Sequence, residues 1–222
     1  MRNNTDPACR SAGSTERNIL LRAGNLFFSV AAILFASLLV AGCSSPTPLS
    51  PEGGNIICFG DSLTYGTGAP TGKSYPDQLA AMTGRPVINA GVPGDTTAGA
   101  LERLDRDVLS RSPRIVLITL GGNDLRRGID KRVAFRNLET IVAAIQAEGA
   151  LAVIGGLKFM LLDRGYGREY EKLAEKTGAL LVPDLLGGLL GNKSLMHDTI
   201  HPNGEGYRVV AKKFYQSIEA FL

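Results

Sequence analysis

The chain has 222 residues, of which 44% are hydrophobic and 20% are charged, a composition typical of globular proteins that excludes a disordered or fibrous chain. Of its 24 basic and 21 acidic residues, four and two respectively lie before Cys43. The remainder is nearly balanced and lacks the excess of basic residues that nucleic-acid binding requires, so no nucleic-acid partner is expected.

Residues 1–42 are typical of an export signal. Arg17 and Arg22 precede an apolar run over 26–40, which is shorter than the roughly 20 residues of a membrane span. The run ends in Val40-Ala41-Gly42-Cys43, which resembles the lipobox of bacterial lipoproteins. That resemblance implies cleavage before Cys43 and lipidation of its sulfur; an uncut hydrophobic anchor helix is the alternative.

We therefore divide the chain into three parts. Residues 1–42 are expected to be a lipoprotein signal peptide, and 43–54 the lipidated cysteine with a flexible tether rich in Ser, Pro and Gly. Residues 55–222 are expected to form one globular domain. This organisation predicts a lipid-anchored protein of the bacterial cell envelope that faces the periplasm or the exterior.

Short apolar runs alternate with amphipathic segments along the globular part, which predicts a parallel sheet with helices on both faces. We expect a flavodoxin-like three-layer α/β/α sandwich with a five-stranded parallel sheet. The strands are expected near 55–60, 87–90, 115–120, 151–154 and 179–182. Helices are expected near 76–82, from the end of the 91–97 loop to about 109, over 130–148 (with Val133 on its apolar face), over 170–176, and from Asn203 to the end. Residues 155–167 are expected to be an irregular loop, and 184–190 a short helical or irregular piece.

The chain has three cysteines. Cys9 would leave with the signal and Cys43 would carry lipid, so Cys58 remains alone in the first strand and no intramolecular disulfide is expected. Because Cys58 lies between apolar neighbours in that strand, we expect a buried, inert thiol.

Ser62 is the candidate nucleophile. The first apolar strand stops abruptly at Gly60-Asp61-Ser62, and the loops at the carboxyl ends of parallel strands commonly carry functional sites. An alternative is that Asp61 and Ser62 only cap the following segment.

His201 and Asp198 are the candidate base and the acid that orients it. The chain has two histidines, and His201 follows Asp198 by three residues between the last strand and the terminal helix. A serine nucleophile needs a base near neutral pH and an acid that holds this base. His197 has no such companion and is interpreted as structural.

Three groups are suitable donors for an oxyanion hole, which stabilises the negative charge that develops on an attacked carbonyl oxygen. They are the backbone N–H groups of Ser62 and Gly94 and the side-chain amide of Asn123. Each follows a different predicted strand, so all three are expected at one edge of the sheet.

Taken together, these segments resemble the sequence blocks of the GDSL, or SGNH, hydrolases. The blocks are Gly60-Asp61-Ser62-Leu63, Gly94, Gly121-Gly122-Asn123-Asp124 and Asp198-Thr199-Ile200-His201, and the resemblance covers nearly all of 55–222. It is nearest to the bacterial arylesterase and thioesterase/lysophospholipase branch. The resemblance implies ester hydrolysis without metal or cofactor, with Ser62, His201 and Asp198 catalytic and Gly94 and Asn123 as oxyanion donors.

Two features depart from that branch. Thr199 replaces the glycine that commonly follows the acid. The segment 155–167 is more apolar than expected, and we interpret its side chains either as part of an acyl-binding wall or as core: Leu157, Phe159, Met160, Leu161 and Leu162.

Other functions compete with the esterase interpretation. The α/β-hydrolase elbow is absent because Thr64 stands where it requires glycine, and Gly72-Lys73-Ser74 lacks the leading glycine of a phosphate-binding loop. A carbohydrate O-deacetylase of the same fold, or a non-catalytic envelope protein that binds glycan or lipid, remains an alternative.

Overall fold

A five-stranded parallel sheet forms the centre of the computed structural model, which describes residues 54–158 and 165–222. Its strand order is β2-β1-β3-β4-β5, the flavodoxin-like order, so the predicted fold class is confirmed. Registers such as Cys58↔Asn89 and Phe59↔Ile118 align the carboxyl ends of β1, β2 and β3. The strands are β1 (Asn55–Gly60), β2 (Val87–Gly91), β3 (Pro113–Thr119), β4 (Leu151–Gly155) and β5 (Leu180–Val182).

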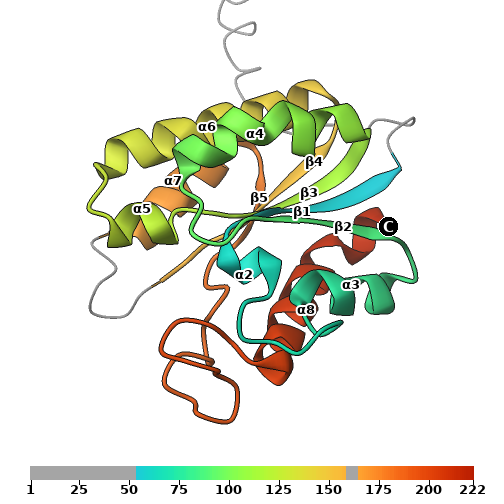
Figure 1. Ribbon diagram of the computed structural model, residues 1–222. Coiled ribbons are helices and arrows are strands. Elements are labelled where there is room, and N and C mark those ends of the chain that lie inside the picture. Colours follow the sequence, from blue (N-terminus) through green and yellow to red (C-terminus); the bar gives the residue numbers. More distant parts are fainter. Residues whose placement is uncertain (1–53, 159–164) are drawn as a thin grey trace, which may run out of the picture. The chain divides into compact units, whose positions relative to one another are not determined.

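Helices cover both faces of the sheet (Figure 1). One face carries α2 (Ser62–Tyr65), α3 (Tyr75–Thr83) and α8 (Gly204–Ile218), and the other carries α4 (Thr97–Asp107), α6 (Lys131–Ala147) and α7 (Tyr166–Thr177). The short helix α5 (Gly122–Arg126) follows β3, and the described residues include 3₁₀ turns at Leu109–Arg111 and Glu219–Phe221.

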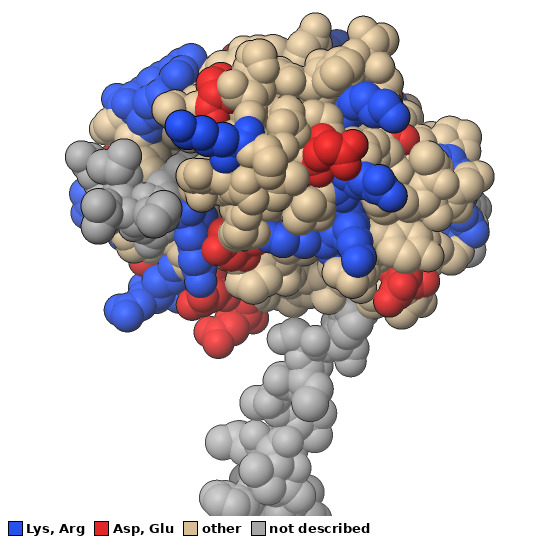
Figure 2. Space-filling model, turned by 90° about the horizontal axis from the view of Figure 1, so that it is seen from below, with Lys and Arg blue, Asp and Glu red and all other residues tan. Residues whose placement is uncertain are grey.

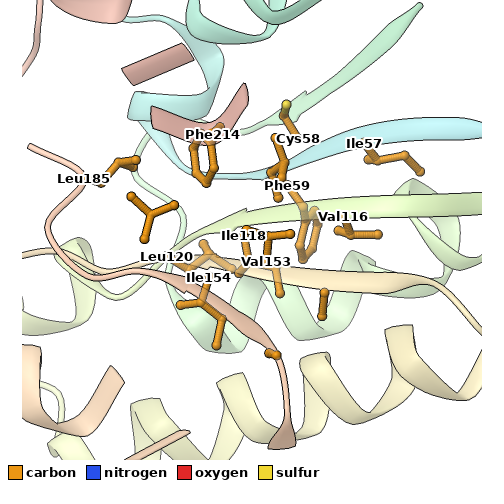
Figure 3. Packing of buried hydrophobic residues seen from close by; sticks show 14 of the residues in the cluster. Ile57, Cys58, Phe59, Val116, Ile118, Leu120, Val153, Ile154, Leu185 and Phe214 are labelled. Carbon is orange, nitrogen blue, oxygen red and sulfur yellow. The ribbon is translucent and has the colours of Figure 1, made fainter. Parts of the chain in front are cut away.

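Successive side chains of β1 pack into different layers. Figure 3 shows Cys58 pointing toward the layer that contains Phe214 of α8, whereas Phe59 points to the opposite face. Both β1 residues are fully buried, as expected for a strand covered on both sides. The prediction of a buried Cys58 is confirmed, and burial raises the pKa of its thiol, which keeps it protonated and unreactive.

The predicted strands and long helices are present, with three differences. The short helices α2 and α5 were not predicted, because single turns carry no apolar period. Helix α7 begins at Tyr166, directly after Gly165 in the left-handed region (φ 82°), four residues earlier than expected. Val133 lies in the first turn of α6 and is 37% exposed rather than buried.

The predictions for 1–53 and 159–164 lie outside the described residues. Within 54–158 and 165–222, no helix has the length and apolar character needed to cross a membrane. Basic and acidic side chains are interspersed on the face shown in Figure 2, in keeping with the near balance of charge.

Candidate active site

Ser62 is held between β1 and the first turn of α2. A side chain at Gly60 would collide with the carbonyl oxygen of Thr119 in β3, so a glycine is needed where β1 ends. The Asp61 carboxylate then accepts the N–H of Leu63 at 3.0 Å and caps α2. The capping role considered for Asp61 therefore applies, and it fixes Ser62 at the carboxyl edge of the sheet.

A hydrogen-bonded chain connects Ser62, His201 and Asp198. Ser62 Oγ lies 3.0 Å from His201 Nε2, and His201 Nδ1 lies 2.7 Å from Asp198 Oδ2. An ionised Asp198 accepts a proton donor, so Nδ1 carries the hydrogen and Nε2 is free to accept from the Ser62 hydroxyl. The structure thus brings together the three residues that the sequence singled out.

The loop before α8 fixes the position of His201. Asp198 Oδ1 accepts the N–H groups of Ile200 at 2.8 Å and His201 at 2.7 Å. Burial acts to raise the pKa of Asp198, but the hydrogen bonds from the His201 side chain and from these two N–H groups outweigh it and lower the pKa to about 2. Asp198 is therefore ionised at any pH at which His201 could act as a base.

His197 lies outside this chain of hydrogen bonds. Its side chain is exposed, and its main-chain N–H donates to the carbonyl oxygen of His201 at 2.8 Å. The contribution of His197 to the site is thus made by its backbone, which helps to close the 196–202 loop.

Asn123 enters the site from the first turn of α5. Gly121 precedes the helix with φ 110°, and a side chain there would collide with the Tyr170 hydroxyl. The Asn123 side-chain Nδ2 donates to Asp61 Oδ2 at 3.1 Å and to the carbonyl oxygen of Asp95 at 2.9 Å. An oxyanion would have to share or replace one of these acceptors.

Gly94 occupies the turn after β2. The Asp95 N–H donates to the Val92 carbonyl oxygen at 3.1 Å, and Gly94 has φ 81°, as a type II turn with Pro93 before it requires. Arg127 Nη2 holds this turn by donating to the Gly94 carbonyl oxygen at 2.7 Å. Within the described residues, neither the Gly94 nor the Ser62 N–H has a hydrogen-bond acceptor, although Gly94 does not line the cavity beside Ser62.

The buried Arg103 of α4 links the strand ends beneath the site, and sequence reasoning did not find it. Its guanidinium donates to the carbonyl oxygens of Gly60 and Ala90, both at 2.9 Å, and to Asp95 Oδ2 at 2.8 Å. It also stacks 4.4 Å from the centre of the Phe59 ring. The sequence signal that could have identified Arg103 is the presence of a charged residue on the otherwise apolar face of this helix.

Asp61 has an unusual environment for a carboxyl group. Burial raises the pKa of Asp61 to about 7, and the nearby carboxylates of Asp95 and Asp124 also raise it. The hydrogen bond from the Leu63 N–H lowers this pKa but does not outweigh burial. Asp124 itself accepts two hydrogen bonds from Thr97, one from the backbone N–H at 3.0 Å and one from the hydroxyl at 2.7 Å. Asp61 thus contacts Asn123, the predicted oxyanion donor, and the carboxyl group of Asp61 changes charge near neutral pH.

A cavity of about 330 Å³ opens beside Ser62. Leu157 lines it, as the acyl-wall hypothesis requires, whereas Phe159, Met160, Leu161 and Leu162 lie outside the described residues. The lining residues are Asp61, Ser62, Leu63, Gly122, Asn123, Leu125, Arg126, Leu157, Leu186, Ile200 and His201. Arg126, Leu186 and Ile200 were not singled out by the sequence.

No metal-binding arrangement accompanies this site in the part of the chain that the structure describes, where no three His, Cys, Asp or Glu side chains are grouped to hold an ion.

The chain matches the model of the GDSL-like lipase/acylhydrolase family over residues 58–209. The chain belongs to this family. A relative from Vibrio mimicus named arylesterase is 30% identical over 204 residues, covering 86% of this chain and 100% of that protein. Esterase TesA of Pseudomonas aeruginosa is 31% identical over 182 residues, covering 75% of this chain and 89% of the relative.

Solved structures agree with the family assignment. The crystal structure of TesA superposes with a TM-score of 0.71 at 28% identity, covering 76% of this chain and 100% of that chain. The psychrotrophic esterase EstA from Pseudoalteromonas, in a structure inhibited by monoethylphosphonate, gives 0.68 at 26% identity, with 75% and 97% covered. This GDSL-family chain is a carboxylic ester hydrolase.

Proposed function

We propose that Ser62 is the nucleophile of this esterase, with His201 as its base and Asp198 as the acid that orients the base. The observation that carries the proposal is the continuous chain of hydrogen bonds, 3.0 Å from Ser62 to His201 and 2.7 Å from His201 to Asp198. Such a chain activates a serine hydroxyl that is otherwise a weak nucleophile.

The proposed reaction proceeds through an acyl-enzyme. Ser62 Oγ attacks the carbonyl carbon while its proton moves to His201 Nε2, and His201 then protonates the leaving alcohol or thiol. Water repeats these steps, losing its proton to His201, and releases the acid and the free serine. The proposed donors to the oxyanion in both halves are the Ser62 and Gly94 N–H groups, which have no acceptor among the described residues, and the Asn123 amide, which would exchange one of its present acceptors for the oxyanion.

The proposed substrates are carboxylic esters or thioesters with an apolar acyl group. Five of the lining residues are leucine or isoleucine, which favours a hydrocarbon chain over a sugar ring. The names of the relatives, arylesterase and esterase TesA, support the same range, as does thioesterase 1/protease 1/lysophospholipase L1 for a relative from Escherichia coli.

We also propose that the enzyme is tethered in the bacterial envelope by lipid on Cys43, after removal of residues 1–42. This rests on the sequence Val40-Ala41-Gly42-Cys43 and the preceding apolar run. Growth with labelled palmitate tests it, because a mature protein without label would exclude the anchor.

The assignment of the nucleophile is tested by covalent labelling. A p-nitrophenyl alkylphosphonate should add one phosphonyl group per chain, and peptide mass spectrometry should find it on Ser62. Labelling elsewhere, or equal labelling of a His201→Ala variant, would contradict the proposal because phosphonylation requires the activated serine.

A further inference from the structure

One charged residue of the cavity has no role in the proposed reaction. Arg126 ends α5 and lines the cavity together with Asn123. Residues three apart on a helix lie on the same face, so Arg126 stands one turn from the proposed oxyanion donor. A guanidinium near the reacting carbonyl would contact a nearby part of the substrate.

Arg103 and Arg127 already have partners in the protein, whereas Arg126 has none among the residues that the structure describes. Arg103 binds two carboxylates and two carbonyl oxygens, and Arg127 donates to the Gly94 carbonyl oxygen. Among 54–158 and 165–222, the exposed guanidinium of Arg126 forms no hydrogen bond or ion pair. Its five N–H donors are therefore available to a ligand.

The acidic residue of the cavity does not neutralise Arg126. Asp61 is 3% exposed, and its two oxygens accept from Leu63 and Asn123. Burial also raises its pKa to about 7, which reduces its negative charge near neutral pH. The charge that faces the cavity from the α5 side is therefore positive.

We propose that Arg126 makes this esterase selective for esters that carry an anionic group, either a carboxylate or a phosphate. The inference rests on the proposed esterase function of the same cavity. Arg126 determines which substrates bind well. The apolar wall of the cavity holds the hydrocarbon part of the ester, and the guanidinium of Arg126 binds its anionic group. Paired N–H donors suit the oxygens of both a carboxylate and a phosphate.

Two matched pairs of esters test the proposal and distinguish the sources of the anion. Monoethyl adipate against ethyl hexanoate places a carboxylate on the acyl side. Hexanoyl glycerol phosphate against hexanoylglycerol places a phosphate on the alcohol side. We expect wild-type kcat/KM to favour the anionic member of at least one pair by about tenfold at low salt, since hydrogen bonds to charged groups are strong, and the preference to weaken as salt screens it.

The variants are Arg126→Gln and Arg126→Lys, with Arg136→Gln as control, because Arg136 is exposed on α6 and does not line the cavity. Arg126→Gln should remove the anionic preference, Arg126→Lys should keep part of it, and Arg136→Gln should leave the ratio unchanged. An unchanged ratio in Arg126→Gln, or a wild type with no preference in either pair, overturns the inference. A failure of the proposed esterase function would give a different result: Ser62→Ala would still hydrolyse the neutral esters.

Discussion

Asn123 Nδ2 donates to Asp61 Oδ2 at 3.1 Å, so the residue before the proposed nucleophile holds the side chain of a proposed oxyanion donor. Asp61 also caps the helix that begins at Ser62. One carboxyl group therefore fixes both the serine and the amide, and it couples the end of β1 to the end of β3.

Replacement of Asn123 by alanine should lower kcat by a few hundredfold, because loss of one oxyanion donor typically raises the barrier by about 3 kcal/mol. The assay is hydrolysis of a short p-nitrophenyl ester. Asn55→Ala is the control, since Asn55 begins β1 at the opposite edge of the sheet and should retain wild-type turnover. Equal kcat for the two variants would exclude Asn123 from the oxyanion hole.

Asp61 should make the fold less stable as the pH rises. Its pKa is about 7 in the folded protein against an ordinary 3.8, so between these values the folded state holds more protons than the unfolded state. The free energy of unfolding should therefore fall as the pH increases from about 4 to about 7. Urea unfolding of the wild type and of Asp61→Asn at several pH values measures the free energy of unfolding, and the variant should lack the pH dependence that Asp61 contributes. Parallel pH profiles for the two proteins would contradict it.

The sequence predicted the sheet and the long helices because their signals are local. The continuous β-branched run of β3 and the three- and four-residue spacing of α8 leave little choice of structure. The single turns α2 and α5 depend instead on a cap at Asp61 and on a left-handed Gly121, which carry no period.

The sequence identified only some of the residues of the candidate site. Ser62, Asn123, Asp198 and His201 were identified because polar residues interrupt the chain directly after predicted strands or before the last helix. Leu157 of the cavity wall was also anticipated, but Arg126, Leu186 and Ile200 were not, because they line the cavity through the relative placement of separate loops. That placement is a tertiary property that neither spacing nor composition contains.

Replacement of Asp198 by asparagine should lower kcat/KM by about a thousandfold or more, since the histidine then loses the acceptor that holds its reactive tautomer. His197→Gln is the matched control within the same loop, because the hydrogen bond between His197 and His201 is made by their backbones. Near-normal activity of Asp198→Asn would remove Asp198 from the proposed triad.

The apolar wall should set the preferred length of the acyl chain. Leu186 and Leu189 are both buried, at 1% and 0% exposed, but only Leu186 lines the cavity. Both Leu186→Ala and Leu189→Ala should lower the free energy of unfolding by about 2–5 kcal/mol. Only Leu186→Ala should raise the rate of octanoate ester hydrolysis relative to that of the butyrate ester. The assay is performed at a temperature at which both variants are folded, and equal ratios would show that Leu186 does not contact the acyl chain.

Every step of the proposed reaction depends on Ser62 forming the acyl-enzyme. The most direct test of this role is the rate of p-nitrophenyl butyrate hydrolysis by Ser62→Ala, with circular dichroism to establish that the variant is folded. Hydrolysis should be abolished, because no other described hydroxyl forms a hydrogen bond with His201. Wild-type activity in a folded Ser62→Ala protein would contradict the assignment of the whole site.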